Sequence, residues 1–211
     1  MTNSIFFGNG LNRISKGSKS WDELLSNITS GHVIKDIPYT LQYEDIYLAN
    51  KINRIDIPAK LSKHTYEYKV KYCISEIVNK FSPNSIFERL ASTQVESYIT
   101  TNYDLTLEKQ FEQNSFEENK NGSDISEQIY SIRRHHSFID PSESRKNIWY
   151  IHGEAKYPKS IMLGYDHYCG AIGKIDSYIK GNYEYKNNNN EVIKIASITE
   201  RLKNSDNNIY S

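Results

Sequence analysis

The feature of this sequence that most restricts its fold is the alternation of short apolar runs with stretches of helical spacing. The apolar runs that we interpret as strands are residues 5–8, 95–100, 130–139, 147–152 and 160–164. Strands that alternate with helices favour a mostly parallel sheet covered by helices. We therefore predict an α/β fold, a Rossmann-like parallel sheet with helices on both faces.

Helices are predicted between these strands. Ser20 followed by Glu23 fits a capping box that opens an amphipathic helix over Leu24, Leu25 and Ile28. Residues 66–81 place apolar side chains three and four positions apart, which is the spacing of one helix face. Further helices are expected at residues 43–53, 87–91, 105–111, 172–179 and 192–202.

Two polar stretches are predicted to be loops. Residues 112–127 are acidic and polar, and residues 183–191 include a run of four asparagines. A chain of 211 residues is long enough for one domain with a real core but short for two. We therefore treat residues 1–211 as a single domain.

Composition narrows the classes of partner. The chain has 26 Lys plus Arg and 26 Asp plus Glu, so no excess of positive charge favours nucleic acid or an anionic membrane. A small-molecule ligand is expected instead. No apolar run approaches the roughly 18 residues of a membrane helix, which favours a soluble, cytoplasmic protein. Two cysteines, Cys73 and Cys169, are too few for a structural zinc site, and no metal is expected.

Three of the predicted strands end in turns that contain glycine or polar side chains. These turns are FGNG at residues 7–10, TTNYD at residues 100–104 and IHG at residues 151–153. In open parallel sheets, ligands bind at the carboxyl ends of the strands. Agreement among three strand ends is stronger evidence for a binding site than any one of them.

The FGNG turn alone has two interpretations. Gly8 and Gly10 allow positive φ and a close approach of the backbone to a phosphate, but they also suit a tight turn without a ligand. The G-x-G-x-x-G fingerprint of dinucleotide-binding proteins is incomplete, because Arg13 stands at its third glycine. The GSKS sequence at residues 17–20 does not have the residue order of a P-loop.

Each of the other two turns, taken alone, also has two interpretations. Asn102 and Asp104 could hold the hydroxyls of a ribose, or either could cap the next helix. His152 has the pKa range of a general base at neutral pH, although a lone histidine after a strand is often structural. Gly153 beside it is interpreted as leaving room for a substrate.

Taken in order, these motifs resemble the sirtuin pattern. FGNGLNR with SWDELL behind it, TTNYD, IHG and LGYDHYCG are most similar to the sirtuin-like domains of bacterial anti-phage defence proteins, which destroy NAD. The resemblance implies that Gly8, Asn9, Gly10 and Asn12 line the NAD phosphate and ribose side and that Asp104 supports the pocket. It assigns the chemistry to Asn102 and His152.

The implied activity is hydrolysis of NAD to nicotinamide and ADP-ribose by a homo-oligomer. Asn102 would orient the water or the ribose hydroxyls, and His152 would act as base. The alternative is a binding or assembly module that holds NAD or a related nucleotide without turnover. Deacylation is not expected, because the four-cysteine zinc ribbon of sirtuin deacylases is missing. The final third also leads us to expect that C-terminal strands are lacking, with weak NAD binding and low activity as the result.

Two histidine-containing stretches are interpreted as structural. His135 and His136 precede Asp140, but adjacent histidines on a strand point to opposite faces and do not readily bind one ion. Asp166 and His167 in GYDHY are expected to cap the helix that follows.

Overall fold

The computed structural model describes residues 3–15, 17–28, 36–48, 61–127, 129–187 and 189–200. Within these residues, one mixed sheet has five strands, in the spatial order β1 (Ser4–Phe7), β2 (Ser97–Thr100), β5 (Arg145–Tyr150), β4 (His135–Ile139) and β3 (Glu117–Glu118). Strands β1, β2 and β5 are parallel, whereas β4 and β3 are each antiparallel to their neighbours. The predicted Rossmann-like α/β fold is confirmed, with a parallel core inside a mixed sheet.

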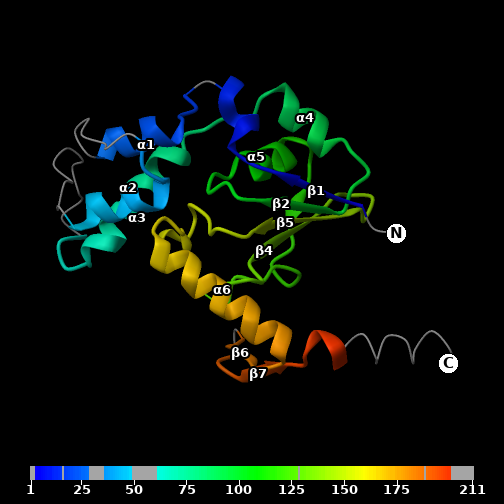
Figure 1. The fold of residues 1–211 in the computed structure, drawn as a ribbon. Coiled ribbons are helices and arrows are strands. Elements are labelled where there is room, and N and C mark those ends of the chain that lie inside the picture. Colours follow the sequence, from blue (N-terminus) through cyan, green and yellow to red (C-terminus); the bar gives the residue numbers. More distant parts are fainter. Residues whose placement is uncertain are drawn as a thin grey trace.

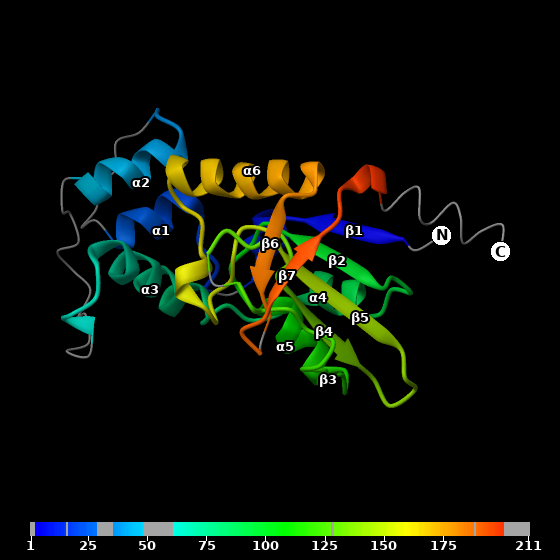
Figure 2. The ribbon, with the colours of Figure 1, turned by 90° about the horizontal axis from the view of Figure 1, so that it is seen from below.

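Helices lie on both sides of this sheet. The short helices α4 (Ser85–Ala91) and α5 (Thr106–Gln113) cover one face, and α6 (Tyr165–Lys180) lies on the other side (Figure 1, Figure 2). The core under α4 and α5 contains buried aromatic and aliphatic side chains, among them Phe7, Phe87, Tyr98, Leu107, Phe111, Phe138, Ile148 and Tyr150. Burial of this apolar surface is what fixes the sheet against the two helices.

A second group of helices lies beyond the carboxyl ends of the parallel strands (Figure 1). It consists of α1 (Trp21–Ile28), α2 (Tyr39–Leu48) and α3 (Tyr66–Val78). The predicted capping box is confirmed, because the Ser20 N–H donates to Glu23 Oε2 (2.5 Å) and the Glu23 N–H donates to Ser20 Oγ (3.1 Å). Residues 49–53 of the helix predicted at 43–53 lie outside the described residues.

The prediction of a loop at residues 112–127 is wrong in part. Phe116 is buried against Phe111, and the next two residues form β3, which pairs with β4. Further along, Asp124 forms an isolated antiparallel bridge with His135. The polar composition of residues 112–127 gave no indication that Phe116 anchors this stretch in the core beside the sheet. Strand β4 itself begins only at His135, later than predicted.

The strand predicted at residues 160–164 does not form. A short 3-10 helix, η3 (Pro158–Ser160), is followed by Ile161, Met162 and Leu163, which are buried but pair with no strand. Ile161 and Leu163 pack in the core of the α1–α3 group. Periodicity does not separate a short apolar run in a strand from one in a buried loop.

The predictions for the last segment are wrong in part, because a helix begins only at residue 198. Strands β6 (Tyr183–Lys186) and β7 (Val192–Ile195) form an antiparallel two-stranded sheet where a loop at 183–191 and a helix at 192–202 were expected. Asn187 Oδ1 accepts hydrogen bonds from the N–H groups of Asn189 and Glu191, which closes the turn between the strands. Residues 201 and 202 lie outside the described residues.

The helix predicted at residues 172–179 is confirmed as part of α6. Its apolar side chains Ile172, Ile175 and Ile179 are exposed. Among the described residues, no helix is long and apolar enough to cross a lipid bilayer.

Candidate functional site

The three predicted turns lie at one edge of the sheet because of the register of the parallel strands. Phe7, Thr100 and Tyr150 are aligned across β1, β2 and β5. Asn9, Asn102 and His152 each come two residues after these aligned positions. The sheet therefore places the three side chains at equivalent points on the edge that faces the α1–α3 group (Figure 1).

A cavity of about 220 Å³ lies at this edge. Its polar wall is formed by Asn9, Thr101, Asn102 and His152 from the strand ends. The remaining lining residues come mainly from the start of α1 and the end of α3, and they are Lys19, Ser20, Trp21, Leu24, Val78, Phe81 and Tyr103. A cavity with one polar and one largely apolar wall is typical of sites for small organic ligands.

Asn102 lines this cavity, and its side chain contains a buried donor without a partner among the described residues. Its side chain is 6 % exposed, and its backbone N–H donates to Thr100 Oγ1 (3.0 Å). The amide nitrogen Nδ2 is buried without a hydrogen-bond partner among the described residues, and the same holds for Nε1 of Trp21. A buried donor without a partner costs about 1–3 kcal/mol.

His152 lies on the same wall and is half-buried. Its ring packs edge-on against Tyr168 of α6, with 5.1 Å between the ring centroids. Burial lowers the pKa of His152 below its usual value. The imidazole is therefore neutral at pH 7, which is the state a general base requires.

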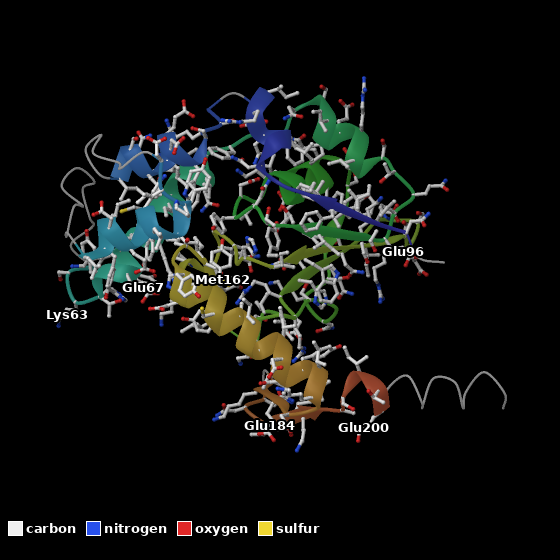
Figure 3. The ribbon with its side chains drawn as sticks, in the orientation of Figure 1. Lys63, Glu67, Glu96, Met162, Glu184 and Glu200 are labelled. Atoms are coloured by element: carbon white, nitrogen blue, oxygen red, sulfur yellow. The ribbon has the colours of Figure 1, made fainter. Side chains whose placement is uncertain are left out.

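Backbone hydrogen bonds join the turns after β2 and β5. The Ala155 N–H donates to the Tyr103 carbonyl oxygen (2.7 Å), and the Met162 N–H donates to the His152 carbonyl oxygen (2.9 Å). The Tyr103 hydroxyl donates to the Met162 carbonyl oxygen (2.5 Å). Met162 lies near the start of α6, between the sheet and the α1–α3 group (Figure 3). These contacts fix the neighbours of Asn102 and His152 relative to each other.

Asn12 and Asp104 lie behind the cavity wall. Asn12 Nδ2 donates to Asp104 Oδ2 (2.6 Å) and to Asn9 Oδ1 (3.2 Å), and Asn12 is fully buried. Asp104 Oδ1 also accepts from the Thr106 N–H at the start of α5 (3.0 Å). The two residues connect the turn after β1 with the turn after β2. Their contact with a nucleotide stays a prediction.

The glycines of the two turns differ from the expectation. Neither Gly8 nor Gly10, in the turn after β1, has positive φ. A Cβ at Gly8 would lie 3.2 Å from Thr101 Oγ1, whereas a Cβ at Gly10 would meet no atom within 4 Å. Gly153 has φ of +87°, and a Cβ there would lie 2.1 Å from the Ser160 carbonyl oxygen. The interpretation that Gly153 leaves room for a substrate is wrong, because Ser160 occupies that space.

The sequence did not reveal a buried group of charged side chains below the His152 turn. Glu154 Oε1 accepts from Arg134 Nη1 (2.8 Å), and Glu154 Oε2 lies 2.9 Å from His136 Nε2. His136 Nδ1 lies 2.7 Å from Glu118 Oε1. Burial lowers the pKa of His136, but the hydrogen bond with Glu154 and the charge of Glu108 outweigh this and raise it to about 9. Burial raises the pKa of Glu108 to about 7.

Adjacent histidines do point to opposite faces of β4, as expected. His136 is buried in the charged group, while the ring of His135 stacks on Trp149 with 4.3 Å between centroids. His167 has the structural role predicted for it, since its Nδ1 accepts from the backbone N–H groups of Leu163 and Gly164 at the start of α6.

Comparison with known proteins shows a similarity between part of the chain and one family. No curated protein sequence matches the chain. Residues 96–195 match the family model described as the SIR2-like domain, and this range includes Asn102, Asp104 and His152. Gly8, Asn9, Gly10 and Asn12 precede the matched range. Residues 96–195 are thus similar to the SIR2-like domain, and they include β2 and β5, whose carboxyl ends lie at the cavity.

Proposed function

We propose that this protein is an NAD glycohydrolase, which hydrolyses NAD to nicotinamide and ADP-ribose. The observation that carries the proposal is the strand register, which brings Asn102 and a neutral His152 to one cavity of a SIR2-like domain. In the proposed reaction, water adds to C1′ of the ribose while the bond from C1′ to the nicotinamide nitrogen breaks. The water proton passes to His152 and then to solvent.

The side chains at the cavity suit this step. Cleavage of a glycosidic bond develops oxocarbenium character at the sugar, as in other glycoside hydrolyses. The nicotinamide of NAD is already a cation and leaves as a neutral ring, so no acid has to protonate it. Asn102 supplies an amide that can orient the water or a ribose hydroxyl, and His152 accepts the proton.

The two walls of the cavity suggest an orientation for NAD. The polar strand ends fit the ribose, and the apolar wall that includes Leu24, Val78 and Phe81 fits the nicotinamide ring. An apolar wall favours the neutral product ring over the cationic ring of the substrate, which assists its departure.

A second candidate is a module that binds NAD or a related nucleotide without turnover. The cavity of about 220 Å³ is below the roughly 300–1,000 Å³ of most ligand pockets, so it offers space for part of a dinucleotide. Partial enclosure of NAD would be compatible with binding that does not lead to turnover. A role in anti-phage defence and assembly into a homo-oligomer stay predictions from the resemblance.

Calorimetric titration with NAD, combined with chromatography of the products, separates these functions. A hydrolase gives nicotinamide and ADP-ribose in equal amounts. A binding module gives a saturable heat of binding and no nicotinamide. If folded protein neither binds NAD nor releases nicotinamide, both proposals fail.

A further inference from the structure

We propose that Glu154 is a positioning residue, held by Arg134 and His136, that fixes the backbone turn carrying His152. The loss of activity that we expect in variants of Glu154 rests on the proposed function. The effect on the placement of the His152 imidazole does not depend on that function.

The side chain of Glu154 is anchored from β4 and the residue before it. Glu154 is fully buried, and so are the side chains of its two partners, since Arg134 is 1 % and His136 0 % exposed. Arg134 Nη1 (2.8 Å) and His136 Nε2 (3.1 Å) both hydrogen-bond to Oε1 of Glu154, and His136 Nε2 also lies 2.9 Å from Oε2. The carboxylate two residues after His152 is thus held between two cationic side chains, although Oε2 itself has no hydrogen-bond partner among the described residues.

The backbone around Glu154 is held as firmly as its side chain. Its N–H donates to Ser160 Oγ (3.0 Å). The next residue, Ala155, donates its N–H to the Tyr103 carbonyl oxygen (2.7 Å) and accepts a hydrogen bond from Ser75 Oγ (2.5 Å). The chain passes from His152 to Glu154 through Gly153 alone. A shift of the Glu154 carboxylate therefore moves the His152 turn.

The ion pairs that Glu154 and His136 already make argue against a metal site in this buried group. Possible ligand atoms of Glu108, His136 and Glu154 lie within 4.8 Å of one another, which is compatible with a metal site. However, Arg134 already binds Glu154, and Glu118 already binds the other nitrogen of His136. A cation added here would have to replace buried ion pairs, and breaking such pairs is costly.

The chain offers a matched control. Glu118 binds the same imidazole as Glu154, but through Nδ1 and from β3, and its other oxygen forms a partly exposed ion pair with Lys156 (3.3 Å). Glu154→Gln and Glu118→Gln both remove one carboxylate charge from His136 and keep the side-chain shape. Only the first changes the buried contacts of the residue two positions after His152, whereas the second also weakens a partly exposed ion pair with Lys156.

The test is NMR of protein labelled with ¹³C at histidine Cε1, with the His152 signal assigned through His152→Ala. We expect Glu154→Gln to shift the His152 signal and Glu118→Gln to leave it in place. Nicotinamide release should fall in Glu154→Gln by about 10- to 100-fold in kcat, with KM within threefold, because geometry is lost and not binding.

Arg134→Lys is the second variant, and it keeps the positive charge if Glu154→Gln fails to fold. It loses the planar donor group, so it should also shift the His152 signal. An unshifted His152 signal in folded Glu154→Gln or Arg134→Lys would overturn the proposal. So would a stoichiometric metal ion in the purified protein. Absence of nicotinamide release with a shifted signal would refute the proposed function and support the positioning role.

Discussion

Asn102 illustrates how single residues at the cavity differ from those that stabilise the fold. Its buried Nδ2 has no partner among the described residues, whereas Nδ2 of Asn84 donates to the Leu11 carbonyl oxygen (2.8 Å) and to Ser15 Oγ (2.7 Å). Oδ1 of Asn84 also caps α4. The amide of Asn84, with four hydrogen-bond partners, stabilises the fold, whereas Nδ2 of Asn102 contributes no such bond within the described part of the chain.

The two asparagines give a paired prediction. Asn102→Ala should lower nicotinamide release about 100-fold, as loss of one oriented donor does, and should change the free energy of unfolding by less than about 1 kcal/mol. Asn84→Ala should cost about 1–2 kcal/mol of stability through the lost cap. Urea denaturation and a rate assay measure both effects. Large destabilisation by Asn102→Ala would show that its amide is structural.

The lowered pKa of His152 predicts how activity depends on pH. The base must be neutral, so kcat/KM should be constant at neutral pH and fall as the pH drops through the pKa of His152. Because burial lowers that pKa, the midpoint should lie below the ordinary value of about 6.5. A midpoint above 7 in the pH–rate profile would contradict the assignment of His152 as a buried base.

Alanine substitutions at Gly153 and Gly10 form a matched pair that tests how closely each glycine turn is packed. Gly153→Ala places a Cβ 2.1 Å from the Ser160 carbonyl oxygen at positive φ, so it should destabilise the protein by at least about 2 kcal/mol. Gly10→Ala meets no atom within 4 Å and should leave thermal melting unchanged. If Gly10→Ala still weakens NAD binding in calorimetry, the backbone there approaches the ligand, as the resemblance implies. Equal melting temperatures for the two variants would disprove the packing argument.

At the scale of helices and strands, the sequence predicts those features that depend on residues close together in the chain. The capping box of α1 and the apolar face of α3 depend on residues three and four positions apart, and both were predicted. The β6–β7 hairpin and β3 were missed, because their strands are short and their pairing depends on partners elsewhere in the chain. A two-residue strand such as β3 is too short to show an alternation of apolar and polar side chains.

The charged contacts between β3, β4 and the turn after β5 predict how stability changes with pH. The folded pKa of His136 is about 9, above the value of about 6.5 in the unfolded chain. Its contribution to stability is therefore fully present below pH 6.5 and is lost as the pH rises through 9. The carboxylates that face His136 are Glu108, Glu118 and Glu154.

His136→Gln removes this contribution. Between pH 6 and pH 9.5, the free energy of unfolding of the wild-type protein should fall more than that of His136→Gln. Urea denaturation at both pH values gives the two differences, and groups common to both proteins cancel. Parallel loss of stability in the two proteins would mean that His136 is not charged in the folded state.

For the whole molecule, the candidate site could be predicted only in part. The three turns were recognisable, since strand ends with polar residues can be read along the chain. What brings Asn9, Asn102 and His152 to equivalent points is the register of β1, β2 and β5, which depends on tertiary packing. The apolar wall comes mainly from α1 and α3, and Val78 and Phe81 carry no local signal of a site.

The central claim is that Asn102 and His152 form one NAD-cleaving site, and the rate of nicotinamide release tests it most directly. The account predicts release by the wild-type protein and a loss of about 10²- to 10⁴-fold in His152→Ala, with NAD affinity and thermal melting preserved. His64→Ala, which changes an exposed histidine remote from the cavity lining, should keep the wild-type rate. Release by His152→Ala within threefold of wild type, or no release by folded wild-type protein, would contradict the account.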